Sequence, residues 1–363
     1  MKLLNPKMNS TKIAMQLTTS HIAEKTYCRT SVRRNKSSIV VLLPGSKKLS
    51  FKYVFIFICV ILFAYKANAQ LTYTNLAVQY DSPWICGKLQ LIPVRFKDTA
   101  YGLTDFAKGS IIGFEQALRE GKISVKETNT PGGDDVTLLE VKNHSKKNIL
   151  VNSGEIVAGG MQDRAFGTTT IIPPTSDKNY LPVFCIEKGR WGKKVKMRSF
   201  RYAGSVDAAL RKQIDVTQKQ NKVWKEIDKQ LADKNIQNLT GAYLDLYKDT
   251  TKIDTGCMNT FKRKMMDSDS AYSGFVAITG NRIINCELFG SSSLCVASFE
   301  VMLKGYMRSI NANDGQPKVS ADEVKLFLNK FLETEAQQQQ YLSLHGRLYS
   351  NNGKAVHLIA YDN

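Results

Sequence analysis

The sequence predicts an α+β fold of one compact unit, with a β-rich antiparallel front, a helical middle and a mixed hairpin-helix end. Short apolar runs bounded by Gly, Pro, Asn or Ser follow one another between residues 84 and 190, which is typical of strands. Apolar residues at steps of three and four then run through 205–235, which favours helix. Near the C-terminus, a Gly-Asn turn at 280–281 and an Asn-Gly turn at 352–353 separate strand-like runs, as in hairpins.

The front is predicted to hold several short strands and one short helix. Residues 86–96 alternate between apolar and polar side chains, as a half-buried strand does. Residues 110–121 favour a helix, with Ser110 as its N-cap and Gly121 as its stop. Further strands are expected at 122–127, 136–143, 148–153, 168–172 and 181–186.

The middle and the end are predicted to alternate helices with hairpins. One long helix or two should cover 205–235, with Ser205 as N-cap. A capping box formed by Ser320 and Glu323 should open a single helix over 320–340. The remaining elements are helices at 240–249, 252–266 and 293–310, and hairpins at 273–290 and 344–362.

No internal repeat and no long linker divides the chain after its basic N-terminal segment. We therefore expect two parts, a leader over 1–69 and a single α+β domain over 70–363. Within the domain, 70–200 should be β-rich, 201–267 helical and 268–363 mixed.

The leader carries the features of an export signal. Three lysines between 47 and 52 precede an apolar run at 53–65, and Ala-Asn-Ala at 67–69 has the small-x-small pattern of a cleavage site. The apolar run is shorter than the ~20 residues of a spanning helix. We expect cleavage after Ala69 and an exported chain, periplasmic or extracellular. The alternative is an uncleaved N-terminal transmembrane anchor.

The positive charge is concentrated in the leader. Residues 1–69 account for +11 of the formal net charge of +19, which leaves +8 for the remainder. No single helix gathers that charge into the basic stripe that nucleic-acid binding needs, so we expect no nucleic-acid partner. A membrane is expected as a partner only through an uncleaved leader. The sequence does not indicate an oligomeric state.

The cysteines after the leader favour neither a metal site nor a complete disulfide framework. Their number is odd and none forms a Cys-x-x-Cys pair, while the three histidines of this part lie far apart, so no metal or cofactor is predicted. Most should be buried hydrophobic side chains. Of the possible disulfides, a bridge between Cys286 and Cys295 is the first to test. The five are Cys86, Cys185, Cys257, Cys286 and Cys295.

The stretch 154–191 contains the candidate site. A Gly-Gly pair lets another group approach the main chain closely, and Arg side chains offer a planar fork for phosphate or carboxylate. A Gln can orient a hydroxyl or amide, a Trp can stack on a ring, and a Glu can act as general base. The predicted ligand-binding residues are Gly160, Gln162, Arg164, Arg190 and Trp191, and the predicted catalytic residues are Glu155 and Glu187.

The same stretch also fits an ordinary bulge and turn. Glu187 and Arg190 would then form a local ion pair, and Trp191 would anchor the core. A thiol enzyme built on Cys185 is the weakest alternative, because no His lies near it in the sequence to activate the thiol.

The motif "GEIVAGGMQDR", followed by "IIPP" and "LPVFCIEKGRW", resembles the signature of the ARG and rhodanese-phosphatase-superfamily-associated protein domain family. The resemblance extends over about residues 75–350, with "KVW" at 222–224 and "CELFGS" at 286–291. Met161 stands where the family has a basic residue, and Asp163 where it has Asn. The matching positions are Gly154, Glu155, Gly160, Gln162, Arg164, Cys185, Glu187, Gly189, Arg190 and Trp191.

The resemblance implies participation in ADP-ribose or NAD-derived metabolism, without a settled reaction. Two functional hypotheses follow, and whether the chain is an enzyme stays open. In the first, an exported domain binds or processes a phosphorylated, nucleotide-like or ADP-ribosyl small molecule through the Arg, Glu, Gln and Trp side chains. In the second, a non-catalytic envelope interaction module uses the same residues as a structural ion-pair network. The first requires the glycine corner (residues 159–164) to face the strand tip (residues 187–191).

Overall fold

The computed structural model places its described residues within one compact unit, Lys66–Asn363. The predicted leader and Trp191 lie outside the described residues. Among these residues, no helix combines the length and hydropathy needed to cross a membrane. The described ranges are 71–98, 110–130, 133–174, 177–190, 199–248, 254–266 and 271–362.

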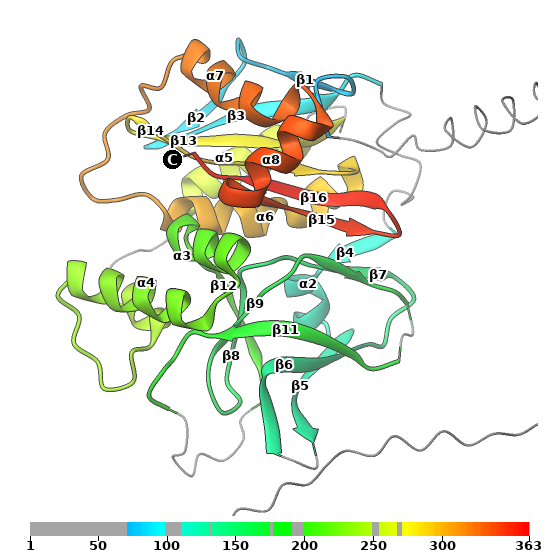
Figure 1. Ribbon diagram of the computed structural model, residues 1–363, viewed down its shortest axis with the longest axis vertical. Coiled ribbons are helices and arrows are strands. Elements are labelled where there is room, and N and C mark those ends of the chain that lie inside the picture. The colour runs from blue at the N-terminus through cyan, green and yellow to red at the C-terminus, as the bar shows by residue number, and fades with distance from the viewer. Residues whose placement is uncertain are drawn as a thin grey trace, which may run out of the picture. The chain divides into compact units, whose positions relative to one another are not determined.

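One large antiparallel sheet is built from both ends of the domain (Figure 1). Its strand order is β1-β3-β13-β14-β16-β15, with β2 also paired to β3. The first strands along the chain therefore join the last ones, because β3 pairs with β13 and not with the strands that follow it in sequence. The strands are β1 (Leu76–Val78), β2 (Trp84–Cys86), β3 (Leu89–Phe96), β13 (Tyr272–Thr279), β14 (Arg282–Phe289), β15 (Gly346–Asn351) and β16 (Lys354–Ala360).

The residues between those two ends form two smaller sheets. One has the order β10-β7-β4 and the other β12-β8-β9-β11-β6-β5. The pairs within them are antiparallel except β4 with β7, which are parallel. The strands are β4 (Ile111–Gly113), β5 (Ile123–Thr130), β6 (Gly133–Asn143), β7 (Asn148–Val151), β8 (Glu155–Ala158), β9 (Arg164–Phe166), β10 (Thr170–Ile172), β11 (Asn179–Cys185) and β12 (Arg201–Ser205).

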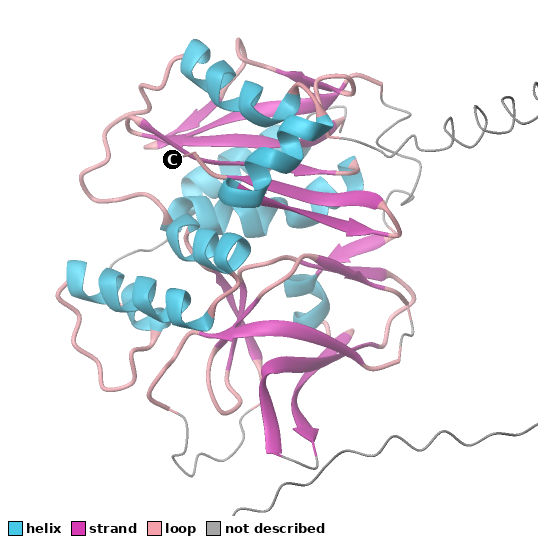
Figure 2. Cartoon of the chain, in the orientation of Figure 1, coloured by secondary structure: helices cyan, strands magenta, loops and turns pink. Residues whose placement is uncertain are grey.

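Helices cover both faces of the large sheet (Figure 2). On one face, α7 and α8 pack Phe327 and Leu342 against the sheet, and on the other α5 and α6 pack Phe261 and Phe299. The helices are α2 (Phe114–Arg119), α3 (Ala208–Lys212), the π-helix η1 (Gln213–Thr217), α4 (Gln220–Asp233), the 3-10 helix η2 (Tyr243–Tyr247), α5 (Thr255–Met266), α6 (Ser292–Arg308), α7 (Ala321–Leu332) and α8 (Glu335–His345).

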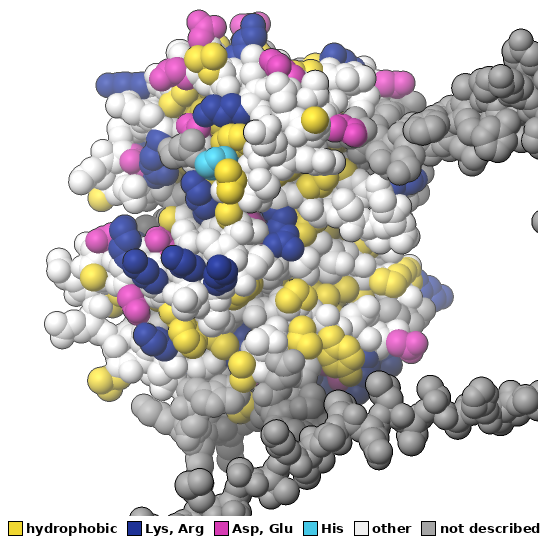
Figure 3. All heavy atoms as spheres, in the orientation of Figure 1, with side chains coloured by type: hydrophobic (Ala, Val, Ile, Leu, Met, Phe, Trp, Pro, Cys, Tyr) yellow, Lys and Arg dark blue, Asp and Glu magenta, His cyan; other side chains and the backbone are white. Residues whose placement is uncertain are grey.

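The exposed face of α4 carries lysines interspersed with acids (Figure 3). Lys229 pairs with Asp233 at 2.8 Å, and Asp228 pairs with Lys188 from the strand tip at 3.6 Å. This mixture is typical of a solvated helix face.

The predicted Cys286–Cys295 disulfide is wrong. Cys286 on β14 belongs to the core under α7 and α8, whereas Cys295 on α6 belongs to the core on the opposite face of the sheet. Both are buried free thiols, as is Cys185. The disulfide instead joins Cys86 at the end of β2 to Cys257 in α5, which attaches that helix to the strand it covers.

The predicted α+β class with antiparallel sheets is confirmed, and both C-terminal hairpins form at their predicted turns. The helix predicted at 110–121 begins only at Phe114 and has Gly113 as its N-cap, so Ser110 is not the cap. The reason is that Ile111–Gly113 pairs with β7 before the helix starts.

The structure has two α-helices within 205–235, as one of the two predicted alternatives had it, and divides the single helix predicted over 320–340. Ser205 ends β12, and Asp207 caps α3 by accepting hydrogen bonds from the backbone amides of Ala209 and Leu210. The π-helix η1 and an extended Lys219 then separate α3 from α4. Residues 320–340 contain α7 and the start of α8, because Thr334 supplies a second N-cap that the capping-box pattern did not reveal.

The disulfide gives a direct prediction for a chain of residues 70–363. Thiol alkylation under denaturing, non-reducing conditions should modify Cys185, Cys286 and Cys295, and should reach Cys86 and Cys257 only after reduction. Cys86→Ser should lower the free energy of unfolding by about 2–5 kcal/mol, because the bridge closes a long loop of the unfolded chain. Peptide mass spectrometry and urea unfolding check both results, and equal alkylation of all five cysteines before reduction would contradict the pairing.

Candidate functional site

The glycine corner and the strand tip lie against each other. Arg190 at the tip donates from Nη2 to Asp163 Oδ1 at 2.8 Å and to the carbonyl oxygen of Gly159 at 3.0 Å. Gln162 donates from Nε2 to the carbonyl oxygen of Lys188 at 3.3 Å. The turn between β8 and β9 thus meets the end of β11, as the ligand-site hypothesis required.

The two glycines of the corner permit this contact. Both have positive φ, +130° at Gly159 and +53° at Gly160, where side chains are strained. A Cβ at Gly159 would lie 2.6 Å from the carbonyl oxygen of Ser199, and a Cβ at Gly160 would lie 2.4 Å from the ring of Phe200. The Gly-Gly pair is therefore explained by the close packing of Ser199 and Phe200 against the glycine corner.

The charged groups of the corner and the tip are paired with one another. Arg190 Nε lies 2.8 Å from Glu187 Oε2, while its Nη2 binds Asp163. Arg164 donates from Nη1 to Gln162 Oε1 at 3.2 Å, and its Nη2 lies 3.9 Å from Glu127 Oε2 on β5. Three carboxylates thus surround two guanidinium groups.

Burial differs between the two arginines. The Arg164 side chain is fully buried, and its Nε and Nη2 have no hydrogen-bond partner among the described residues. The Arg190 side chain is 20% exposed.

Burial and the neighbouring Asp163 raise the pKa of Glu187, against the opposing effect of Arg190. Burial also raises the pKa of the Cys185 thiol, which keeps it in the unreactive form.

The structure does not bring Glu155 to the corner. Its Oε2 accepts from the backbone amide of Asn152 at 2.7 Å and from Asn152 Nδ2 at 3.2 Å. The side chain is fully buried, and burial raises its pKa to about 7. Of the predicted site residues, Gly160, Gln162, Arg164, Glu187 and Arg190 gather at the corner, Glu155 lies apart, and Trp191 is outside the described residues.

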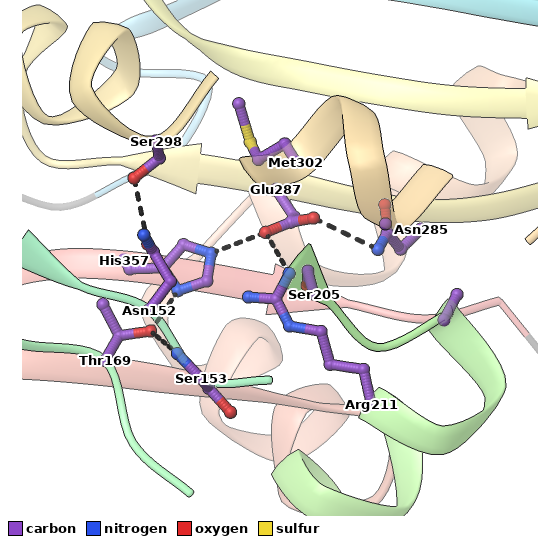
Figure 4. A network of polar contacts seen from close by, with 12 residues as sticks. Asn152, Ser153, Thr169, Ser205, Arg211, Asn285, Glu287, Ser298, Met302 and His357 are labelled. Atoms are coloured by element: carbon purple, nitrogen blue, oxygen red, sulfur yellow. Dashed lines mark hydrogen bonds and ion pairs between the residues drawn. The ribbon is translucent and has the colours of Figure 1, made fainter. Parts of the chain in front are cut away.

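A second polar cluster, which the sequence reasoning missed, lies where the sheets meet (Figure 4). We call Asn152, Ser153, Thr169, Arg211, Asp215, Glu287, Ser298 and His357 the central network; each is at least nine-tenths buried. At its centre, Glu287 Oε2 lies 2.9 Å from Arg211 Nη1 and 3.1 Å from His357 Nε2. Burial opposes ionisation of Glu287, but Arg211 and then His357 outweigh it and lower its pKa to about 2.

His357 links Glu287 to a hydroxyl. Its Nδ1 lies 3.0 Å from Thr169 Oγ1, which also accepts from the backbone amide of Ser153 at 3.1 Å. Burial lowers the pKa of His357, which favours the neutral ring. Nε2 then donates to Glu287, and the unprotonated Nδ1 accepts from the Thr169 hydroxyl. The acid–His–hydroxyl order is that of a nucleophilic relay. However, His357 is fully buried between the rings of Phe289 and Tyr349, so this relay is closed to substrate.

The network spans elements that lie far apart in the sequence. Asp215 in η1 accepts from Ser153 Oγ, from Tyr349 at 2.6 Å and from Tyr361 at 2.7 Å. Ser298 on α6 donates to Asn152 Oδ1 at 2.9 Å. These contacts join the large sheet, the turn after β7, the π-helix η1 and the helix α6. The sequence signals that could have revealed the network are a Glu and a His inside the apolar runs of β14 and β16.

The described residues contain no group of three or more His, Cys, Asp or Glu side chains arranged to hold a metal ion. Together, the fold and the contacts define the class of protein: it is an α+β domain whose sheets are joined by a buried ion-pair network. The chain belongs to the ARG and Rhodanese-Phosphatase-superfamily-associated Protein domain family, whose sequence profile matches residues 77–360. This confirms the family resemblance seen in the sequence motifs. Comparison with curated proteins and with solved structures gave no match.

Replacing Glu287 by Gln should destabilise the domain strongly. The buried Arg211 guanidinium would lose the charge at 2.9 Å, and breaking a buried pair costs about 3–5 kcal/mol. Urea unfolding measures the loss. Asp233→Asn is the control, since the Lys229–Asp233 pair is exposed and should contribute little. Equal, small effects of both substitutions would show that the network does not hold the sheets together.

Glu155 should make stability depend on pH. Its folded pKa of about 7 lies above the ordinary value of 4.5, so its contribution to stability is full below pH 4.5 and is lost as the pH rises through 7. The free energy of unfolding of Glu155→Gln, relative to that of the unmodified chain, should therefore rise from pH 5 to pH 8. Urea unfolding at both pH values checks this, with Glu140→Gln as a matched strand control. If the free energies of unfolding of Glu155→Gln and the unmodified chain differ by the same amount at both pH values, the raised pKa of Glu155 is refuted.

Proposed function

We propose that this chain is an exported, non-catalytic interaction module in which the corner and the tip form part of the framework. The observation that carries the proposal is the pairing of charges at the corner. Arg190 contacts Asp163 and Glu187, and Arg164 contacts Gln162 and faces Glu127. Their positive charges are matched within the protein.

This pairing argues against a phosphate as the main ligand group. A phosphate bound at Arg190 would have to displace Asp163 and Glu187, which have only 12% and 9% of their side-chain surfaces exposed. Two nearly buried carboxylates would then lack a partner, which is costly. An added anion would also join a cluster that already has one more carboxylate than guanidinium.

Export is supported by the leader pattern and by the disulfide. The apolar run at 53–65 and the Ala-Asn-Ala pattern after it are typical of a signal peptide. The Cys86–Cys257 bridge suits an oxidising compartment, since disulfides persist outside the cytosol. The proposal therefore places the module in the periplasm or the extracellular space.

A second candidate function, binding of an ADP-ribosyl or other nucleotide-like ligand, is favoured by one specific observation. Arg164 Nε and Nη2 have no hydrogen-bond partner among the described residues, although buried donors are normally satisfied. A ligand oxygen reaching Arg164 past the partly exposed Arg190 would satisfy them, with Glu187 and Asp163 able to accept from sugar hydroxyls.

One variant separates the two candidates. If the corner is framework, Arg190→Ala should lower the free energy of unfolding by about 3 kcal/mol, because Asp163 and Glu187 lose their shared partner. Lys229→Ala, which removes a cation that is 65% exposed, should leave it nearly unchanged. Thermal and urea unfolding of residues 70–363 provide the measurement.

The same proteins are then titrated calorimetrically with ADP-ribose. The framework proposal expects no binding heat with any of them. An Arg190→Ala variant of unaltered stability that loses ADP-ribose binding, while Lys229→Ala keeps it, would overturn the proposal in favour of the second candidate.

A further inference from the structure

A pocket away from the corner lies beside the central network. It has a volume of about 340 Å³, within the range of small-molecule sites. The π-helix η1, the helix α8 and the edge strand β15 supply its walls. π-Helical turns occur frequently at functional sites. The lining residues are Asp215, Val216, Gln338, Gln339, Leu342, Ser343, Gly346, Arg347 and Leu348.

Arg347 is the one cation in this lining. It donates from Nη1 to the main-chain carbonyl oxygen of Asp215 at 3.3 Å, and its guanidinium carbon lies 5.3 Å from the ring centre of Tyr349. These contacts hold the guanidinium in place and leave Nε and Nη2 without a hydrogen-bond partner among the described residues. The Asp215 carboxylate binds Ser153, Tyr349 and Tyr361 and is not within ion-pair distance of Arg347.

The rest of the lining combines aliphatic side chains with uncharged polar ones and the Asp215 carboxylate. Val216, Leu342 and Leu348 provide aliphatic surface, and Leu348 is 39% exposed. The amide of Gln338 donates to the carbonyl oxygens of Leu71 and Phe331, so its donors are used. A ligand for this pocket therefore needs an anionic group for the fork and an apolar part for the aliphatic wall.

We propose that this pocket binds a small amphipathic carboxylate, with the carboxylate accepting from Arg347 Nε and Nη2 and the hydrocarbon part lying along Val216, Leu342 and Leu348. Arg forks bind carboxylates bidentately, which gives both strength and orientation. The proposal goes beyond the proposed function and does not depend on the corner, because none of its residues contacts Arg190 or Arg164.

Calorimetric titration with octanoate tests the proposal, with octanol as the neutral ligand of equal chain length and inorganic phosphate as the anion without an apolar part. Octanoate should bind the unmodified domain more tightly than either. Arg347→Met should weaken octanoate binding at least about tenfold and leave octanol unchanged, because charge-assisted hydrogen bonds are lost while packing is kept.

Arg263→Met, at an exposed position of α5, is the matched control and should bind octanoate as the unmodified domain does. Thermal unfolding of each variant confirms that it is folded, and Leu348→Asp offers a second disruption of the pocket wall. Equal affinities for octanoate and octanol, or equal losses in Arg347→Met and Arg263→Met, would overturn the inference. Either result would leave the stability test at Arg190 unaffected.

Discussion

The ion pair between Glu287 and Arg211 is the interaction on which the arrangement of the sheets depends. Both side chains are almost completely removed from water, and the 2.9 Å contact between them is the shortest ion pair that either makes; Asp215 at 3.5 Å from Arg211 and His357 at 3.1 Å from Glu287 support it. Glu287 comes from the centre of the large sheet and Arg211 from the helix that follows the smaller sheets. The pair fixes the relative position of these elements in a way that apolar packing alone, being non-directional, does not.

Local patterns in the sequence were sufficient for the class of fold and for the C-terminal hairpins. They were insufficient where a long-range partner competes with a local signal. Ser110 precedes a helix-like run, but Ile111–Gly113 pairs with β7 first. Cys286 and Cys295 are close in sequence, yet β14 and α6 place them on opposite faces of one sheet. Such outcomes are set by tertiary pairing, which periodicity does not encode.

The candidate site was predictable only where its residues are close together in the sequence. Glycines and charged side chains concentrated in one stretch marked the corner, and the tip does contact it through Arg190 and Asp163. The central network had no such concentration, because its members come from β14, β16, α3 and η1. Only the unusual presence of Glu287 and His357 within apolar runs marked it. A buried charge in a strand therefore indicates a distant partner even when its identity cannot be read locally.

The pairing of β3 with β13 has a consequence for how the chain is made. A nascent chain emerges from its N-terminus, so Leu89–Phe96 is synthesised long before Tyr272–Thr279 exists to receive it. Until then, β3 presents an apolar, unpaired edge of the kind that associates with other chains. Closing such a sheet requires contacts of high sequence separation, which form slowly. The domain should thus remain incompletely folded until nearly its whole length has been synthesised.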